Sequence, residues 1–81
     1  MTNEQLKNRT KAFSLRILEL IEIMPNSISS RVVINQLAKS GTSVGANYRA
    51  VCRARGDKEF VAKLNIVLEE VDEAQFWLEI I

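Results

Sequence analysis

One spacing of apolar and small residues recurs in three segments of this 81-residue chain, and it constrains the fold more than any other feature. The residues follow one another at alternating intervals of three and four, which places them on one face of an α-helix. We call each set a seam. The first seam comprises Leu6, Thr10, Phe13, Ile17, Leu20 and Met24. The second comprises Ile34, Leu37, Gly41, Val44, Tyr48 and Val51, and the third comprises Phe60, Leu64, Val67, Val71, Ala74, Leu78 and Ile81. Three amphipathic helices are therefore expected.

Local signals mark both ends of the first helix. Thr2 followed three residues later by Gln5 is a capping-box pattern. The ring of Pro25 cannot continue a helix. The first helix is therefore expected over about residues 3–24.

The second and third helices are expected over about residues 29–55 and 57–81. The third has Asp57 as a plausible N-terminal cap. The second is capped by one of three serines, and the sequence leaves open which of them: Ser27, Ser29 or Ser30.

The middle of the second helix has weak helix propensity, because Gly41 and Gly45 lie four residues apart among small side chains. Either the helix breaks there, or the small residues allow another helix to approach closely. The seam continues on both sides, which favours an unbroken helix with both glycines as contact points.

Composition agrees with an all-α fold in a single domain, residues 1–81. The chain is 47% apolar, with only three Gly and one Pro. A core this small stabilises a chain only marginally, so we expect self-association or a partner.

The absence of His excludes the commonest general base and metal ligand. We expect no enzymatic activity, no cofactor and no metal site, because no phosphate loop or nucleophile motif occurs either.

Cys52 is the only cysteine, and we expect it to be a small buried apolar residue. With no signal peptide or membrane-spanning run, these features predict a cytoplasmic protein.

Charge is distributed unevenly along the chain. Residues 1–56 carry nine Lys and Arg against three Asp and Glu, whereas residues 57–81 carry two against seven. Four cations are close in sequence: Arg49, Arg53, Arg55 and Lys58. They are suited to bind phosphate, but ordinary solvation or pairing with the acidic run explains them more simply. That run consists of Glu69, Glu70, Asp72 and Glu73, and it lacks the second ligand cluster that a bundle metal site needs.

A polar stripe lies beside the second seam and consists of Gln36, Ser40, Ser43 and Asn47. It is either a small-molecule site or a structural feature whose side chains bond one another and backbone carbonyls. We favour the structural role, because buried polar groups in bundles fix helix register.

The last residues favour a role in packing. Phe76 and Trp77 are expected to be core or interface anchors rather than platforms for bases. The chain ends at Ile81 inside the third seam without a helix stop signal, so we expect a further segment to follow it.

Residues 36–50 read Gln-Leu-Ala-Lys-Ser-Gly-Thr-Ser-Val-Gly-Ala-Asn-Tyr-Arg-Ala and resemble the signature of the 23S rRNA intervening-sequence protein family. The matching positions are Gln36, Leu37, Lys39, Ser40, Ser43, Val44, Ala46, Asn47 and Phe60. The chain departs from the pattern at Gly56, where Ser is common, and at Ala50, where an acidic residue is frequent. The family's fourth helix is absent.

This resemblance implies an antiparallel up-and-down bundle of the four-helix type. Family members are similar to the accessory protein of diversity-generating retroelements, which forms a homopentamer and binds nucleic acid. The resemblance therefore implies self-assembly, with a pentamer as the expected form, and it implies no enzymatic activity.

We accordingly expect a non-enzymatic, self-assembling protein that binds the phosphates of RNA or DNA. The expected contacts are Lys39, Arg49, Arg53 and Arg55. The alternative is a protein-interaction module whose apolar seams dock a partner helix and which binds no nucleic acid.

Overall fold

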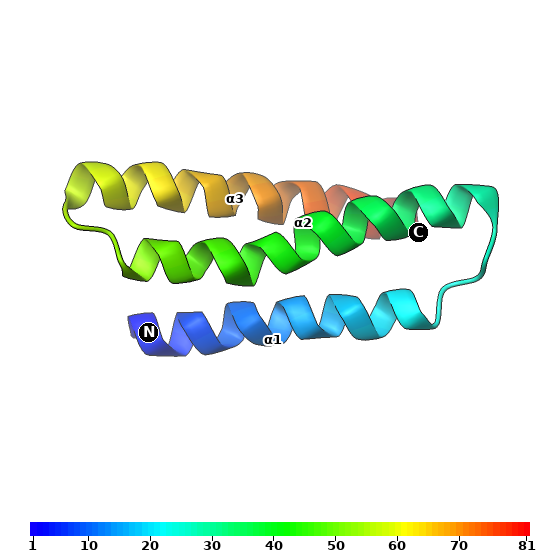
Figure 1. The fold of residues 1–81 in the computed structure, drawn as a ribbon, viewed down its shortest axis with the longest axis horizontal. Coiled ribbons are helices and arrows are strands. Elements are labelled where there is room, and N and C mark those ends of the chain that lie inside the picture. Colours follow the sequence, from blue (N-terminus) through cyan, green and yellow to red (C-terminus); the bar gives the residue numbers. More distant parts are fainter.

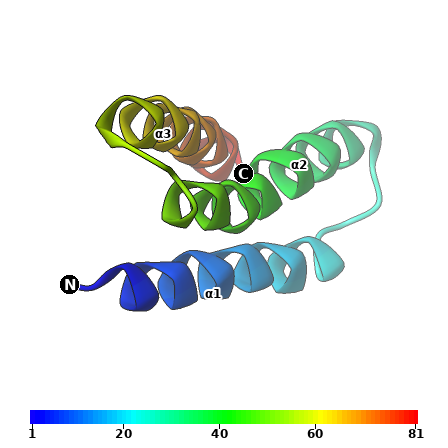
Figure 2. The ribbon, with the colours of Figure 1, turned by 60° about the vertical axis from the view of Figure 1, so that its left-hand side comes forward.

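The computed structural model describes residues 1–81 and contains three α-helices and no strands. They are α1 (Asn3–Glu22), α2 (Ile28–Cys52) and α3 (Asp57–Ile80). Each helix runs antiparallel to the one before it, and α2 lies between the other two (Figures 1 and 2). The all-α class expected from the three seams is confirmed.

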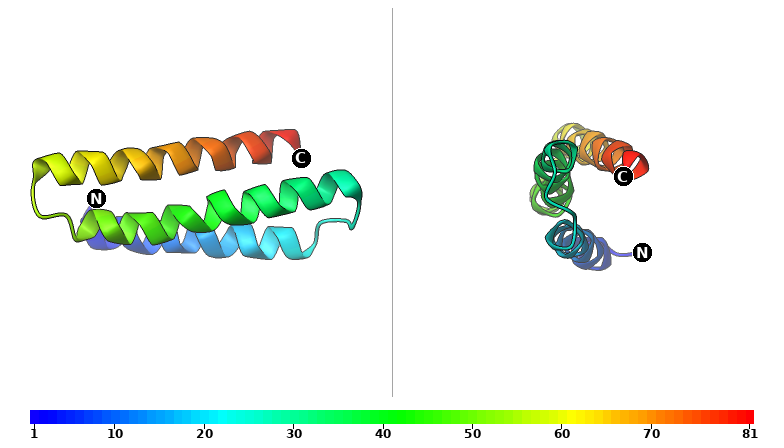
Figure 3. Two further views of the ribbon diagram at one scale, coloured as in Figure 1. Left: turned by 45° about the horizontal axis from the view of Figure 1, so that its top comes forward. Right: turned by 90° about the vertical axis from the view of Figure 1, so that its right-hand side faces the viewer.

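The three helices form an open arc. Helix α2 packs against α1 and α3, whereas α1 and α3 do not pack against each other. The end view in Figure 3 shows α2 at the bend of the arc. The molecule is an elongated body of 45 × 20 × 16 Å. Because α2 is the only helix with two neighbours, it organises the fold.

Helix α1 begins as its capping box predicts. The backbone N–H of Gln5 donates to Thr2 Oγ1 over 3.1 Å, and the N–H of Thr2 donates to Gln5 Oε1 over 2.8 Å. The helix ends at Glu22, two residues earlier than expected. Met24 precedes Pro25, and the proline ring disfavours helical backbone in the residue before it.

The N-terminus of α2 is capped by Ser27, whose hydroxyl accepts from the N–H of Ser30 over 3.1 Å. This settles which of the three serines is the cap. The helix then runs without a break to Cys52. The expected end at residue 55 was three residues too late, because the chain leaves the helix at Arg53 to turn towards α3.

Helix α3 begins at Asp57, so the expectation that Asp57 is the cap was wrong. Gly56 holds the cap position, and no side chain bonds the first N–H groups of the helix. Asp57 and Glu59 lie in the first turn, where the helix dipole favours anions.

The core follows the predicted seams. One cluster joins Val44, Tyr48 and Val51 of α2 to Val67 of α3. A second joins three fully or nearly buried residues, one from each helix: Ile17, Leu37 and Ala74. All positions of the second seam are buried except Ile34, which is half-buried.

The seams of the two outer helices are only partly covered. Leu6, Phe60, Val71 and Leu78 each expose between 36% and 39% of their surface. A seam position in a closed bundle would be buried, so the open side of the arc leaves apolar surface without a neighbour. No helix in the chain is both long and apolar enough to cross a membrane.

Candidate nucleic-acid interface

The positive charges of α2 lie along one exposed face. Starting at Arg31, positions on this face recur every three or four residues and end at Arg53, immediately after the helix. We call this set the basic ridge: Arg31, Asn35, Lys39, Thr42, Ala46, Arg49 and Arg53. At about 100° per residue, the ridge lies roughly opposite the buried seam of α2, on the outer side of the bend.

No carboxylate neutralises this ridge from within α2. The chain contains no Asp or Glu between Glu22 and Asp57. The one ion pair in the structure lies within α3, where Lys63 Nζ is 3.6 Å from Glu59 Oε1. The cations therefore do not pair with the acidic run of α3, whereas their exposure agrees with the other simple interpretation, ordinary solvation. The four charges of the ridge instead sum to a positive potential on one side of the molecule.

The four contacts expected from the sequence are all exposed, but not all of them lie on the helix. Lys39 and Arg49 are exposed on α2, Arg53 follows its last residue, and Arg55 lies in the connection to α3. The structure adds Arg31, which sequence reasoning missed. Arg31 is eight residues from Lys39, two turns away on the same face, and this spacing was the available signal.

Helix α1 brings further positive charge to the ridge. The Cα atom of Lys11 lies 3.3 Å from the position that a Cβ on Gly45 would occupy, so Lys11 adjoins the C-terminal half of α2. Phe13, two residues further on, packs into the core. Lys11 therefore lies on the outer side of α1, where Lys7 precedes it by one turn.

The two glycines of α2 hold α1 close, as the sequence predicted. A Cβ on Gly41 would lie 2.6 Å from Ile17 Cγ2, and one on Gly45 would lie 3.1 Å from the carbonyl oxygen of Thr10. Ser14 of α1 lies where the backbones of α1 and α2 approach each other at these glycines. Its hydroxyl donates to the carbonyl of Gly41 over 2.8 Å and accepts from the N–H of Gly45 over 3.1 Å. These contacts hold α1 against α2, beside the basic ridge.

Replacing Ser14 by alanine should lower the free energy of unfolding by about 1 kcal/mol, because it removes hydrogen bonds made where the two backbones meet. Chemical denaturation measures this change. Ser29→Ala is the control, since Ser29 is exposed and its side chain makes no hydrogen bond, and it should change stability by less than about 0.5 kcal/mol. Equal stability of Ser14→Ala and the parent would contradict the role of Ser14.

The polar stripe bonds to its own helix. The hydroxyl of Ser40 donates to the carbonyl of Gln36 over 2.9 Å, and that of Ser43 donates to the carbonyl of Lys39 over 2.7 Å. The four side chains of the stripe make no hydrogen bonds with one another. Gln36 is exposed and Asn47 is half-buried. No pocket lies over the stripe.

The expectation that Cys52 is buried was wrong. Cys52 is the last residue of α2, off the seam, and its side chain is exposed. Tyr48, one turn earlier, is the buried neighbour, and its hydroxyl donates to Asn3 Oδ1 over 3.3 Å. Burial raises the pKa of Tyr48 above its usual value, and the nearby Cys52 raises it further.

The two aromatic side chains near the C-terminus have different surroundings. Trp77 packs against the cluster of Ile17, Leu37 and Ala74, in agreement with a core role. Phe76 is more than half exposed and contacts Trp77 edge to face, with 5.0 Å between the ring centroids.

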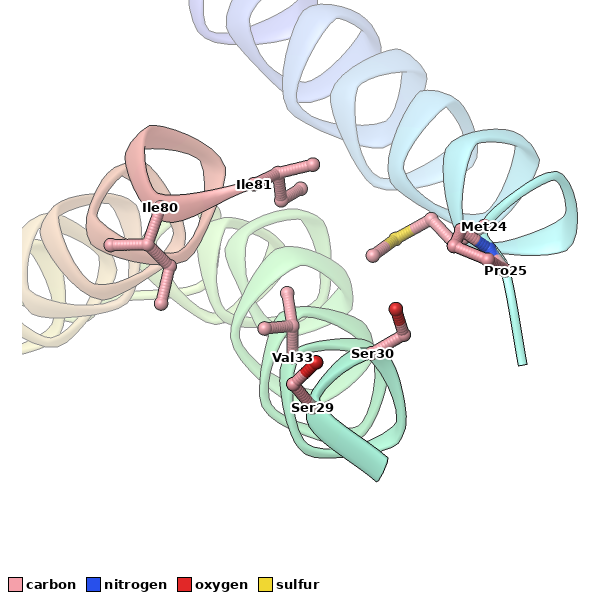
Figure 4. Close-up of a pocket in the computed structure, with 7 residues that line it drawn as sticks. All are labelled: Met24, Pro25, Ser29, Ser30, Val33, Ile80 and Ile81. Carbon is pink, nitrogen blue, oxygen red and sulfur yellow. The ribbon is translucent and has the colours of Figure 1, made fainter. Parts of the chain in front are cut away.

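An apolar cavity of about 340 Å³ lies where the C-terminal ends of α1 and α3 meet the start of α2 (Figure 4). Its lining residues are Met24, Pro25, Ser29, Ser30, Val33, Ile80 and Ile81. None of them is ionisable, and the two serine hydroxyls are its polar side-chain groups. No three Cys, Asp or Glu side chains of the chain come together as metal ligands.

These features define a small all-α protein of antiparallel helices with a basic outer ridge and a partly uncovered apolar inner side. The chain belongs to the 23S rRNA-intervening sequence protein family, whose family model matches residues 2–81. No curated protein matches the sequence.

A solved structure supports the same assignment. The chain is similar to a protein of unknown function from the S23 ribosomal protein family of Bacteroides thetaiotaomicron. The two share 36% sequence identity with a TM-score of 0.87, and the match covers 99% of this chain and 71% of the other.

Proposed function

We propose that this protein is a non-enzymatic nucleic-acid-binding protein that holds RNA or DNA by its phosphates. The observation that carries the proposal is the basic ridge, which presents Arg31, Lys39, Arg49 and Arg53 along one exposed face without a carboxylate between them. Arg55, in the connection after the ridge, extends the same positive surface.

Binding of this kind works by charge neutralisation. Each Lys or Arg that contacts a phosphate releases a condensed counterion, and guanidinium groups also offer forked donors to the phosphate oxygens. Contacts to phosphates carry no direct information about base sequence. Four ridge cations on a duplex predict that log K falls against log salt with a slope of about −3 to −4.

Replacing Lys39 and Arg49 together by glutamine should weaken binding by about tenfold or more at low salt and reduce the salt slope by about two. Fluorescence anisotropy with labelled RNA and DNA measures both quantities. Arg16→Gln is the matched control, because Arg16 is an exposed cation on α1 and does not belong to the ridge. Absence of binding at low salt, binding that salt does not weaken, or equal effects of both variants would each contradict the proposal.

We further propose that the protein self-associates through the uncovered seams of its outer helices. The support is the exposure of Leu6, Phe60, Val71 and Leu78 on a chain of 9.2 kDa that buries few side chains. A ring would bring several ridges to one nucleic acid, and the pentamer that the family resemblance implies is its expected size. Light scattering should give a multiple of 9.2 kDa. A monomer at all concentrations would contradict this.

The same exposed seams support a second candidate function, a protein-interaction module that docks a partner helix and binds no nucleic acid. The two candidates differ in one measurement. A partner complex that survives nuclease treatment and is lost when Phe60 is replaced by serine favours the module. Binding of purified nucleic acid to the basic ridge favours the leading proposal.

A further inference from the structure

We infer that the ligand of the basic ridge is a duplex nucleic acid rather than a single strand. This inference rests on the proposed function and names the class of nucleic acid that the ridge takes. It concerns the phosphodiester duplex as such, and RNA and DNA duplexes are separate arms of the test below.

The ridge offers no aromatic surface on which an unpaired base could stack. Proteins that hold single strands combine positive charge with aromatic side chains, and each stacked base adds about fivefold to a hundredfold in affinity. None of the seven ridge positions is aromatic. Tyr48 is the only aromatic residue of α2, and it lies in the buried seam.

The exposed aromatic residues lie on α3, which is acidic and would repel a polyanion. Phe60 and Phe76 are exposed on α3. Residues 57–81, which include α3, carry two cations against seven carboxylates. A strand whose bases stacked there would place its phosphates beside net negative charge, which repels them.

The length and straightness of the ridge match those of a nucleic-acid duplex. Helix α2 is unbroken from its cap at Ser27, and the 18 residue steps from Arg31 to Arg49 span about 27 Å at 1.5 Å per residue. That length corresponds to about eight base-pair steps of a duplex. A duplex is straight over this distance, because its persistence length is about 50 nm.

A single strand would have to be ordered along the same line. Ordering a flexible chain costs conformational entropy, and here no aromatic stacking contact offsets that cost. A duplex is already ordered and carries about twice the charge per unit length of a single strand. The ridge also lies roughly opposite the buried seam of α2, the helix at the bend of the arc (Figure 3), whereas single strands are held in grooves.

The first experiment compares probes on the full chain. A duplex of about 20 base pairs, in RNA and DNA versions, exceeds the length of the ridge, and an unstructured oligo-U or oligo-dT of equal length is the single strand. Anisotropy titrations at low salt should show the duplex binding about tenfold or more tightly, with loss of that binding in the Lys39→Gln/Arg49→Gln variant.

A second variant adds an aromatic side chain to the ridge. Ala46 is exposed in the middle of the ridge, so Ala46→Trp adds a stacking surface without removing a charge. It should raise single-strand affinity by about fivefold or more and should not raise duplex affinity, because paired bases inside a duplex cannot stack on the added ring. Ala46→Leu is the control, since it adds apolar bulk without an aromatic face.

The outcomes separate this inference from the proposed function. Single strands that bind as tightly as duplexes, with ridge dependence and salt dependence intact, overturn the duplex inference and leave phosphate binding standing. Failure of every probe to bind overturns both. A preference for the duplex, together with a gain for Ala46→Trp on single strands alone, supports both.

Discussion

Replacing Leu37 by alanine is expected to lower the free energy of unfolding by about 3 kcal/mol. Leu37 has no exposed surface and lies in the cluster that joins it to Ile17 of α1 and Ala74 of α3. Truncating a fully buried leucine removes its burial and leaves a cavity, which together cost about 2–5 kcal/mol. Because the cavity adjoins both outer helices, the loss affects both helix interfaces at once.

Urea denaturation followed by circular dichroism at 222 nm (the standard helical band) measures this loss as a shift in the midpoint. Leu15→Ala is the matched control, since Leu15 is 51% exposed on α1. It should cost less than about 1 kcal/mol, because most of its surface is already in water. Equal losses for the two variants would contradict the position of Leu37 at the centre of the arc.

Replacing Gly41 by valine is expected to destabilise the fold by about 2–3 kcal/mol. The Cβ alone would lie 2.6 Å from Ile17 Cγ2, inside van der Waals contact, and Ile17 is itself buried. Overpacking of this kind costs about 1–3 kcal/mol, and two further methyl groups add to it. Helix α1 would have to move away from α2, which also strains the hydrogen bonds of Ser14.

A double-mutant cycle identifies the cause. Ile17→Ala removes the two Cγ atoms that a side chain at position 41 would meet most closely, so the double variant should be at least about 1 kcal/mol more stable than the sum of the two single losses predicts. Gly56→Val is the control, because nothing lies within 4 Å of its Cβ position and its backbone is extended. Additive losses at positions 17 and 41 would refute the close contact.

The number and type of the helices could be predicted from the sequence because the seams are local. Alternating intervals of three and four identify a helix face whatever packs against it. The seam of α2 predicted its burial well, because this helix has neighbours on both sides. The outer seams predicted positions such as Phe60 less well, because burial there depends on how many helices the fold brings together.

The ends of the helices could be predicted only where one residue decides them. Thr2 and Gln5 fix the start of α1 through two hydrogen bonds. No residue between Cys52 and Gly56 forbids a helix, and α2 ends there because the chain must turn back towards α3. A tertiary requirement of this kind leaves no local pattern, which is also why the exposure of Cys52 was missed.

The candidate site could be predicted in part. Lys39 and Arg49 were named from the sequence, but the pairing of Arg49 with the acidic run, one of its two simple explanations, does not occur. Net charge along a sequence does not tell which face of each helix carries it. Arg31 was missed because it has no cation near it in sequence, and only the helix brings it into line with Lys39.

The open arc has a consequence for how the molecule comes apart. Since α1 and α3 share no interface, the fold is two helical hairpins that hold α2 in common. Detachment of α1 leaves the contacts between α2 and α3 in place, and detachment of α3 leaves those between α1 and α2, as in arrays where each unit contacts only its neighbours. Local opening therefore begins at the outer helices, and the shared helix is the last to lose its protection.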